Sequence, residues 1–93
     1  MMECAVELFG TLRQLIGAPE VRLSLAAGSK LRDVLGALVQ REPRLLEGVV
    51  EPDMHALIAP YRFYREGKGF VDDLGQKVEQ GDRFLLMSAA VGG

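Results

Sequence analysis

The residues whose type and placement most directly suggest chemistry are the last three, Val91, Gly92 and Gly93. They follow a compact apolar run at residues 83–87, with the sequence RFLLM. Glycine loses more backbone freedom on ordering than any other residue, so a Gly-Gly pair adds little to folding. Two residues without Cβ atoms can instead thread a narrow channel and present a carboxylate to another enzyme. A merely flexible terminus is the simpler alternative.

Other reactive side chains fit structural roles better. Cys4, the single cysteine, has no base near it in sequence and is predicted to lie on the inward face of a strand. His55, the single histidine, has no partners with which to form a metal site. Paired carboxylates can act as acid and base, but the pairs here fit solvated turns: Asp72 with Asp73, and Glu79 with Asp82. We therefore expect the protein to have no catalytic side chains of its own and to bind neither a cofactor nor a metal.

An aromatic and basic segment at residues 61–68, with the sequence YRFYREGK, has two interpretations. Aromatic rings interleaved with cations can stack on single-stranded nucleic acid. The same alternation also describes a hairpin with two distinct faces. Because the formal net charge is −2 and the sequence indicates no wider basic surface, we favour recognition of a protein partner over nucleic-acid binding.

Composition sets the broad class of the protein. A length of 93 residues, 48% of them hydrophobic, suits one domain, residues 1–93, with an aliphatic core. A formal charge of −2 gives no field strong enough to imply nucleic acid or an anionic membrane. The single cysteine favours a reducing compartment, and we find neither a signal peptide nor an apolar run of about 20 residues. We therefore expect a cytoplasmic protein.

Two strands and one helix are predicted in the first half of the chain. Residues 4–9 and 21–25 alternate apolar and polar side chains, which indicates two strands joined as an antiparallel hairpin. From Leu31 to Val39 the apolar residues recur at helical spacing, with Ser29 as the N-cap and Pro43 as the stop. Residues 44–50 form either a short helix or a covering loop.

The second half holds two further predicted strands. Residues 54–59 are predicted as a strand that Pro60 ends, and residues 83–87 as the last strand. Residues 61–69 are expected to form a hairpin tip or mobile loop, with its turn at residues 66–69. A hairpin, a long helix and two later strands predict a sheet packed on one helix, which is an α+β layout.

Both ends of the sequence resemble a known family. Residues 81–87 (GDRFLLM), followed by six residues that end in Gly92-Gly93, look like the closing segment of the MoaD/ThiS family of ubiquitin-like sulfur carriers. Residues 6–17 (VELFGTLRQLIG) resemble the first strand and following turn of that family. The closest resemblance is to the small subunit of molybdopterin synthase.

The resemblance implies a fold and a chemistry. The fold is the β-grasp, a mixed sheet of four to five strands packed on one main helix, with the first and last strands adjacent and parallel. An E1-like adenylating enzyme would use ATP to activate the Gly93 carboxylate, and a sulfur donor would convert it to a thiocarboxylate. The sulfur would pass to the molybdopterin-synthase large subunit or another acceptor. Extended from Ser88, the tail would reach roughly 20 Å into a partner, with Gly92 and Val91 threading its channel.

The sequence departs from the family at two places. Residues 88–91 (SAAV) stand where molybdopterin-synthase small subunits often carry a proline pair, and the stretch from Pro60 to Phe70 is longer than the turn expected there. Either difference favours a sulfur carrier whose acceptor is not the molybdopterin-synthase large subunit. Two alternatives stay open: a ubiquitin-like modifier joined through Gly93 to lysines of target proteins, and a non-catalytic ubiquitin-like interaction domain.

A docking surface is also predicted. Alternation divides the residues of the first and last strands between the two sheet faces. The set expected to face the helix is Val6, Leu8, Phe84 and Leu86. The opposite set, Phe9, Leu85 and Met87, is predicted to bind partners, because apolar side chains exposed on neighbouring strands mark such surfaces and the resemblance implies this face. The alternative is that residues 61–70 fold over this set as a second small core.

Overall fold

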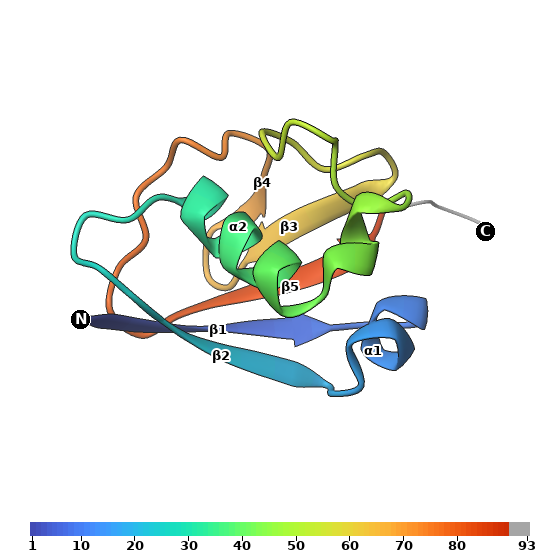
Figure 1. Cartoon of the computed structure of the whole chain (residues 1–93). Helices are drawn as coiled ribbons and strands as arrows, with labels where there is room; N and C mark the ends of the chain where they lie inside the picture. The colour runs from blue at the N-terminus through green and yellow to red at the C-terminus, as the bar shows by residue number, and fades with distance from the viewer. Residues whose placement is uncertain (90–93) are drawn as a thin grey trace.

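The computed structural model describes residues 1–89, in which short strands and helices alternate along the chain (Figure 1). Their bounds are β1 Met2–Leu8, α1 Thr11–Ile16, β2 Glu20–Leu25, α2 Leu31–Arg41, the 3₁₀ helix η1 Pro43–Leu46, β3 Tyr61–Arg65, β4 Gly69–Val71 and β5 Asp82–Ser88. The strands predicted near the two ends and the helix that begins at Leu31 are confirmed.

Within the described residues, the strands form one mixed sheet in the order β2-β1-β5-β3-β4. At its centre β1 and β5 run parallel, with Val6 opposite Phe84. The remaining neighbours are antiparallel. The predicted α+β layout is therefore confirmed, including the adjacent and parallel first and last strands.

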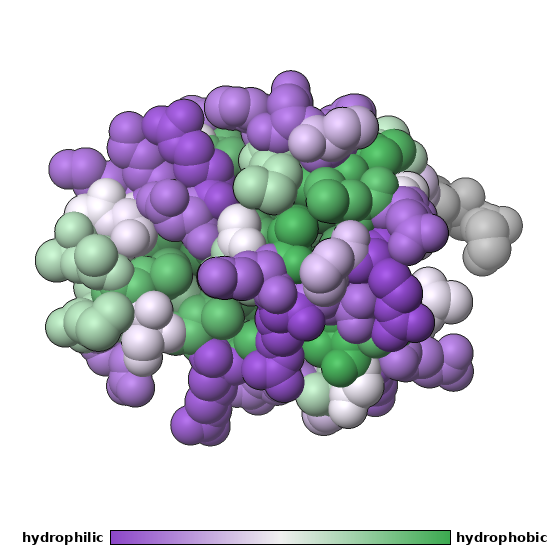
Figure 2. Space-filling view, in the orientation of Figure 1, coloured by the Kyte–Doolittle hydropathy of each residue, from purple (hydrophilic) through white to green (hydrophobic). Residues whose placement is uncertain are grey.

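One face of the sheet packs on α2, which lies in front of it in Figure 1. The helix buries an apolar stripe of Leu31, Val34, Leu35, Leu38 and Val39. The sheet residues buried opposite include the set predicted to face the helix, Val6, Leu8, Phe84 and Leu86, together with Phe63. Seen from the same side, hydrophilic and hydrophobic residues are interspersed over the outer surface of the helical layer (Figure 2).

The start of α2 is held differently from the prediction. Lys30 is the N-cap in place of Ser29, and its backbone N–H donates to Asp33 Oδ2 at 2.7 Å. The N–H of Leu31 donates to the Gln76 carbonyl at 2.9 Å. A segment distant in sequence thus satisfies an N–H group that the first turn of a helix leaves without a partner.

Residues 54–59, predicted as a strand, instead form an irregular loop. The backbone N–H of His55 donates to Asp53 Oδ1 at 3.0 Å, and Met54 takes a left-handed φ of 61°. An aspartate that binds the backbone two residues further on produces a turn. This local hydrogen bond bends the chain where the apolar pattern suggested an extended segment.

The stretch from Pro60 to Phe70 belongs to the sheet and is not an added loop. Residues 61–65 form β3, which lies between β5 and β4. The predicted turn at residues 66–69 is confirmed, and Gly67 and Gly69 supply its positive φ angles of 84° and 98°. Because β3 lies beside β5 within the sheet, the alternative in which this segment folds over β5 is wrong.

Leu35→Ala and Leu38→Ala are each expected to lower the free energy of unfolding by about 2–5 kcal/mol, because both side chains are fully buried between α2 and the sheet. Gln40→Ala, at an exposed position of α2, is the matched control and should change it by less than about 0.5 kcal/mol. Urea denaturation followed by circular dichroism measures these values. A control-sized change at both leucines would refute the packing of α2 on the sheet.

Candidate functional site

The root of the C-terminal tail is the end of β5. This strand ends at Ser88, which pairs with Tyr61 of β3. Beyond it, the backbone N–H of Ala89 donates to the Pro60 carbonyl at 2.7 Å. The sheet therefore holds the chain as far as Ala89, the last residue that the structure describes. The residues predicted to react and to thread a channel lie outside the described part: Val91, Gly92 and Gly93.

The sheet face away from α2, here called the open face, carries the outward residues of the strands. Leu85 and Met87 alternate with buried residues of β5 and are half-buried. Leu85 lies opposite Tyr64 of β3 in the register. Phe9 follows β1, is also half-buried, and lines a common hollow with Met87. The structure thus brings all three predicted docking residues to neighbouring positions.

Two aromatic residues extend this surface: Tyr64, from the aromatic and basic segment predicted to recognise a partner, and Phe70, which the sequence analysis did not single out. Their rings meet edge to face, with centroids 5.3 Å apart. The Arg62 guanidinium lies 4.1 Å from the centroid of the Phe70 ring, which is 46% exposed as a residue. The predicted turn at residues 66–69 could have revealed this pair from the sequence, since a hairpin with this turn places the two aromatic residues opposite each other. We call Phe9, Tyr64, Phe70, Leu85 and Met87 the apolar patch.

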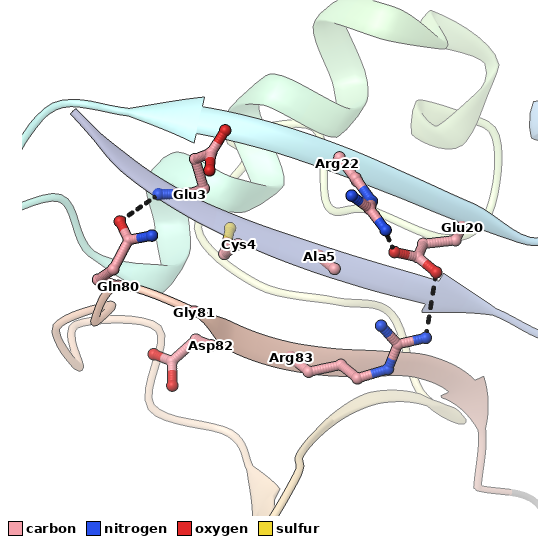
Figure 3. A pocket seen from close by; sticks show the side chains of 9 residues that line it. All are labelled: Glu3, Cys4, Ala5, Glu20, Arg22, Gln80, Gly81, Asp82 and Arg83. Atoms are coloured by element: carbon pink, nitrogen blue, oxygen red, sulfur yellow. Dashed lines mark hydrogen bonds and ion pairs between the residues drawn. The ribbon is translucent and has the colours of Figure 1, made fainter.

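A charged network adjoins the apolar patch on the open face. Arg83 of β5 pairs with Glu7 at 3.3 Å and with Glu20 at 3.1 Å. Arg22 also pairs with Glu20, at 3.3 Å, and Figure 3 shows the two arginines converging on this carboxylate. The hydrogen bond from Arg83 holds the pKa of the Glu20 carboxyl below its ordinary value. The network spans β2, β1 and β5 and keeps charge beside the patch.

Solved structures of other proteins share this fold. SAMP1 (small archaeal modifier protein 1) from Haloferax volcanii has a TM-score of 0.82 and 27% identity, over 98% of this chain and 99% of its own. A Pyrococcus furiosus protein provisionally named molybdopterin converting factor subunit 1 has a TM-score of 0.80 and 21% identity, over 97% and 100% of the two chains. The Amycolatopsis orientalis BexX/CysO complex contains a match with a TM-score of 0.73 and 20% identity, over 97% and 99%. The chain is a ubiquitin-like β-grasp protein.

The resemblance to the MoaD/ThiS family is confirmed by these neighbours. No protein-family model matches the sequence, and no curated protein matches it significantly. The likeness to the three solved structures extends over 97–98% of this chain.

In this β-grasp protein, a buried ion pair fixes the start of β5. Arg65 Nη2 and Asp82 Oδ2 are 2.5 Å apart, and the side chains are 6% and 16% exposed. The same oxygen accepts the backbone N–H of Glu79 at 2.7 Å. The interpretation of Asp82 as a solvated turn residue is therefore wrong. Arg65 is turned toward the core by β3, and Asp82 supplies its counter-charge.

The other candidate reactive side chains, Cys4 and His55, lie on different elements, β1 and the loop before β3. Cys4 is buried, and burial raises the pKa of its thiol, as does the nearby Asp82 carboxylate, so the reactive thiolate is disfavoured. His55 is exposed in the loop before β3. Among residues 1–89, no group of three or more His, Cys, Asp or Glu side chains could hold a metal ion. None of the helices in this part of the chain is long and apolar enough to cross a membrane.

Asp82→Ala is expected to lower the free energy of unfolding by about 3–5 kcal/mol, because it leaves the buried Arg65 guanidinium without its counter-charge. The matched control is Asp72→Ala, which breaks an exposed pair with Arg62 and should cost about 0–1 kcal/mol. Both values come from urea unfolding at neutral pH. Similar small losses in the two variants would show that the buried pair does not hold β5.

Proposed function

We propose that the chain is a sulfur carrier that presents Gly93 as a thiocarboxylate, and that it serves molybdopterin biosynthesis. The observation that carries the proposal is the full-length likeness to SAMP1 and to the Pyrococcus furiosus protein named after a molybdopterin converting factor. The resemblance of residues 81–93 to the closing segment of the MoaD/ThiS family supports it. The chain would act in the cytoplasm as the small partner of a sulfurtransferase.

The proposed chemistry takes place on the Gly93 carboxyl group within partner enzymes. A carboxylate is a poor acyl electrophile, so an E1-like enzyme first joins it to AMP: its oxygen attacks the α-phosphorus of ATP and pyrophosphate leaves. Sulfur at the oxidation level of sulfide then attacks the carbonyl carbon. The C–S bond forms, the C–O bond to AMP breaks, and AMP departs with the electron pair. The thiocarboxylate then delivers its sulfur to an acceptor, and water restores the carboxylate.

The fold suits this role through the separation of docking from chemistry. The sheet ends at a defined tail root, and the apolar patch with its charged border lies on the same open face. Large apolar side chains at an interface commonly provide most of the binding energy, while charged groups at its border favour the correct partner and orientation. We propose that the activating enzyme and the sulfur acceptor both dock on this face, with Phe9, Leu85 and Met87 among the contacts.

A second candidate function is protein modification, in which Gly93 is joined to lysines of target proteins. The 27% identity to SAMP1, whose name describes a modifier, favours it. Intact mass spectrometry after incubation with ATP, an activating enzyme and a sulfur donor separates the candidates. Sulfur in place of one oxygen supports the carrier, and Gly-Gly remnants on lysines of other proteins support the modifier. No change with a cognate activating enzyme supports an interaction domain.

Deletion of Gly93 is expected to abolish adenylation and to leave the melting temperature unchanged, because the proposed role of this residue is chemical. Gly92→Val should also block adenylation, since a branched side chain obstructs a channel that admits glycine. Ala90→Gly is the matched control, because it alters the tail without adding volume. Pyrophosphate release measures all three variants. Normal adenylation of the deletion variant would disprove the proposal.

Phe9→Ala and Met87→Asp are expected to weaken binding to the activating enzyme by more than about fivefold, as loss of an apolar interface anchor does. The melting temperature should stay close to that of the unchanged protein, because both side chains lie outside the buried core. Leu46→Ala is the control, since this residue is 38% exposed in η1, on the helical side of the sheet. Calorimetric titration and thermal melts on the same variants decide. A sharp loss of stability with unchanged affinity per folded molecule would remove these residues from the docking surface.

A further inference from the structure

A hollow of about 380 Å³ lies at the tail root. Figure 1 shows α1 and the end of β5 at the same end of the sheet. The hollow lies between them, and we call it the tail-root pocket. Its lining residues come from the turn between β1 and α1, the start of α1, the start of β3 and the end of β5: Phe9, Gly10, Thr11, Tyr61, Met87 and Ser88.

Backbone hydrogen bonds hold the walls of the tail-root pocket in place. The N–H groups of Leu12 and Arg13 donate to the carbonyls of Phe9 and Gly10, at 3.2 Å each. Gly10 has a φ of 59° and a ψ of −134°, a conformation that glycine adopts readily and other residues avoid. On the opposite wall, the Tyr61 N–H donates to the Ile58 carbonyl at 2.9 Å. The pocket is therefore formed before any partner arrives.

The length of the tail determines what must cover this pocket. Gly93 is four residues beyond Ala89, so its carboxylate can lie at most about 14 Å from that residue. An enzyme that acts on the carboxylate has to bring its active site within this distance. A protein interface of ordinary size covers about 800 Å² of each partner, which corresponds to a disc about 16 Å in radius. The tail-root pocket includes Ser88, the residue next to Ala89, and thus lies inside this footprint.

The lining identifies the chemistry of the occupant. Phe9 and Met87 are the large apolar residues of the lining, Thr11, Tyr61 and Ser88 carry hydroxyl groups, and the lining includes no charged residue. Tyr61 also packs against the core. A charged group that entered would lose its water without gaining a counter-charge. An aliphatic or aromatic side chain gains burial there, and the flexible methionine adapts to its shape.

We propose that the tail-root pocket receives an apolar side chain that projects from the rim of the channel in the enzyme acting on Gly93. This inference rests on the proposed function and adds the point of contact. An anchor at this position fixes the origin of the tail as it enters the channel. Docking then restricts the conformations of the tail before it enters the channel, which lowers the entropy cost of threading the tail. The carboxylate is thereby confined to a smaller volume near the active site.

Thr11→Phe tests the proposal by filling the pocket from its exposed rim. We expect kcat/KM for adenylation to fall by at least about tenfold through a higher KM for this protein, as loss of one interface anchor predicts. Gln14→Phe is the matched control, because it adds the same ring at an exposed position of α1 outside the pocket. It should leave kcat/KM unchanged.

The outcomes separate this proposal from the function on which it rests. If the unchanged protein is not adenylated, the proposed function fails. If it is adenylated and folded Thr11→Phe reacts equally well, the pocket proposal alone is overturned. A faster reaction of Thr11→Phe also overturns it, since the enzyme would then have no need of an empty pocket. Should Thr11→Phe lower the melting temperature, Thr11→Leu repeats the test with a smaller side chain.

A measurement on the unchanged protein identifies the occupant directly. With the Met87 methyl group labelled with ¹³C, the complex with the activating enzyme should give nuclear Overhauser contacts to aliphatic or aromatic protons of that enzyme. Labelled Met54, exposed in the loop before β3, is the control and should give none. Absence of contacts at Met87 in a saturated complex would overturn the proposal.

Discussion

The main helix, α2, has eleven residues and packs on one face of a sheet of five strands. This packing decides which side chains of each strand are buried and which are left for contact with other molecules. A helix of that length, about 16 Å, gives one face of the sheet a dry core. Phe84 and Leu86 are buried on this face, whereas Leu85 and Met87 of the same strand are left to the open face. Polarity on the open face changes along β5, from Arg83 to Met87, so its apolar end is the end next to the tail.

Local periodicity was sufficient to predict β1, β2, α2 and β5, because each buries one regular face. Contacts between distant segments decided what periodicity missed. Residues 61–69 were expected to form a hairpin tip or a mobile loop, and the structure has a hairpin of two sheet strands. In β3, the charged Arg65 occupies an inward position, and its pairing with Asp82 makes that position tolerable. Ser29 lost its predicted capping role to Lys30, whose N–H donates to the Asp33 side chain. Carbonyls of a remote segment accept the next two N–H groups of the helix. In residues 54–59, the hydrogen bond that the His55 N–H donates to the Asp53 side chain outweighed the apolar pattern.

The candidate site was predictable where it depends on alternation alone, as the placement of Leu85 and Met87 shows. Phe70 could not be found in this way, because its neighbourhood with Tyr64 requires the register of β3 and β4. The tail-root pocket could not be predicted from sequence, since three elements and a turn build it and none carries a pattern for it. Surfaces made by one strand follow from sequence, whereas surfaces made by several elements require their arrangement in space.

The parallel pairing of β1 with β5 has a consequence for the order of events in the life of the molecule. These strands come from opposite ends of the described chain, and closing so long a loop costs entropy before the contacts compensate it. During synthesis β1 leaves the ribosome before β5, so the two strands can pair only after β5 has emerged. A tail anchored beside Pro60 therefore exists only after this late pairing has formed. Only molecules that have completed this late pairing therefore carry a formed tail root.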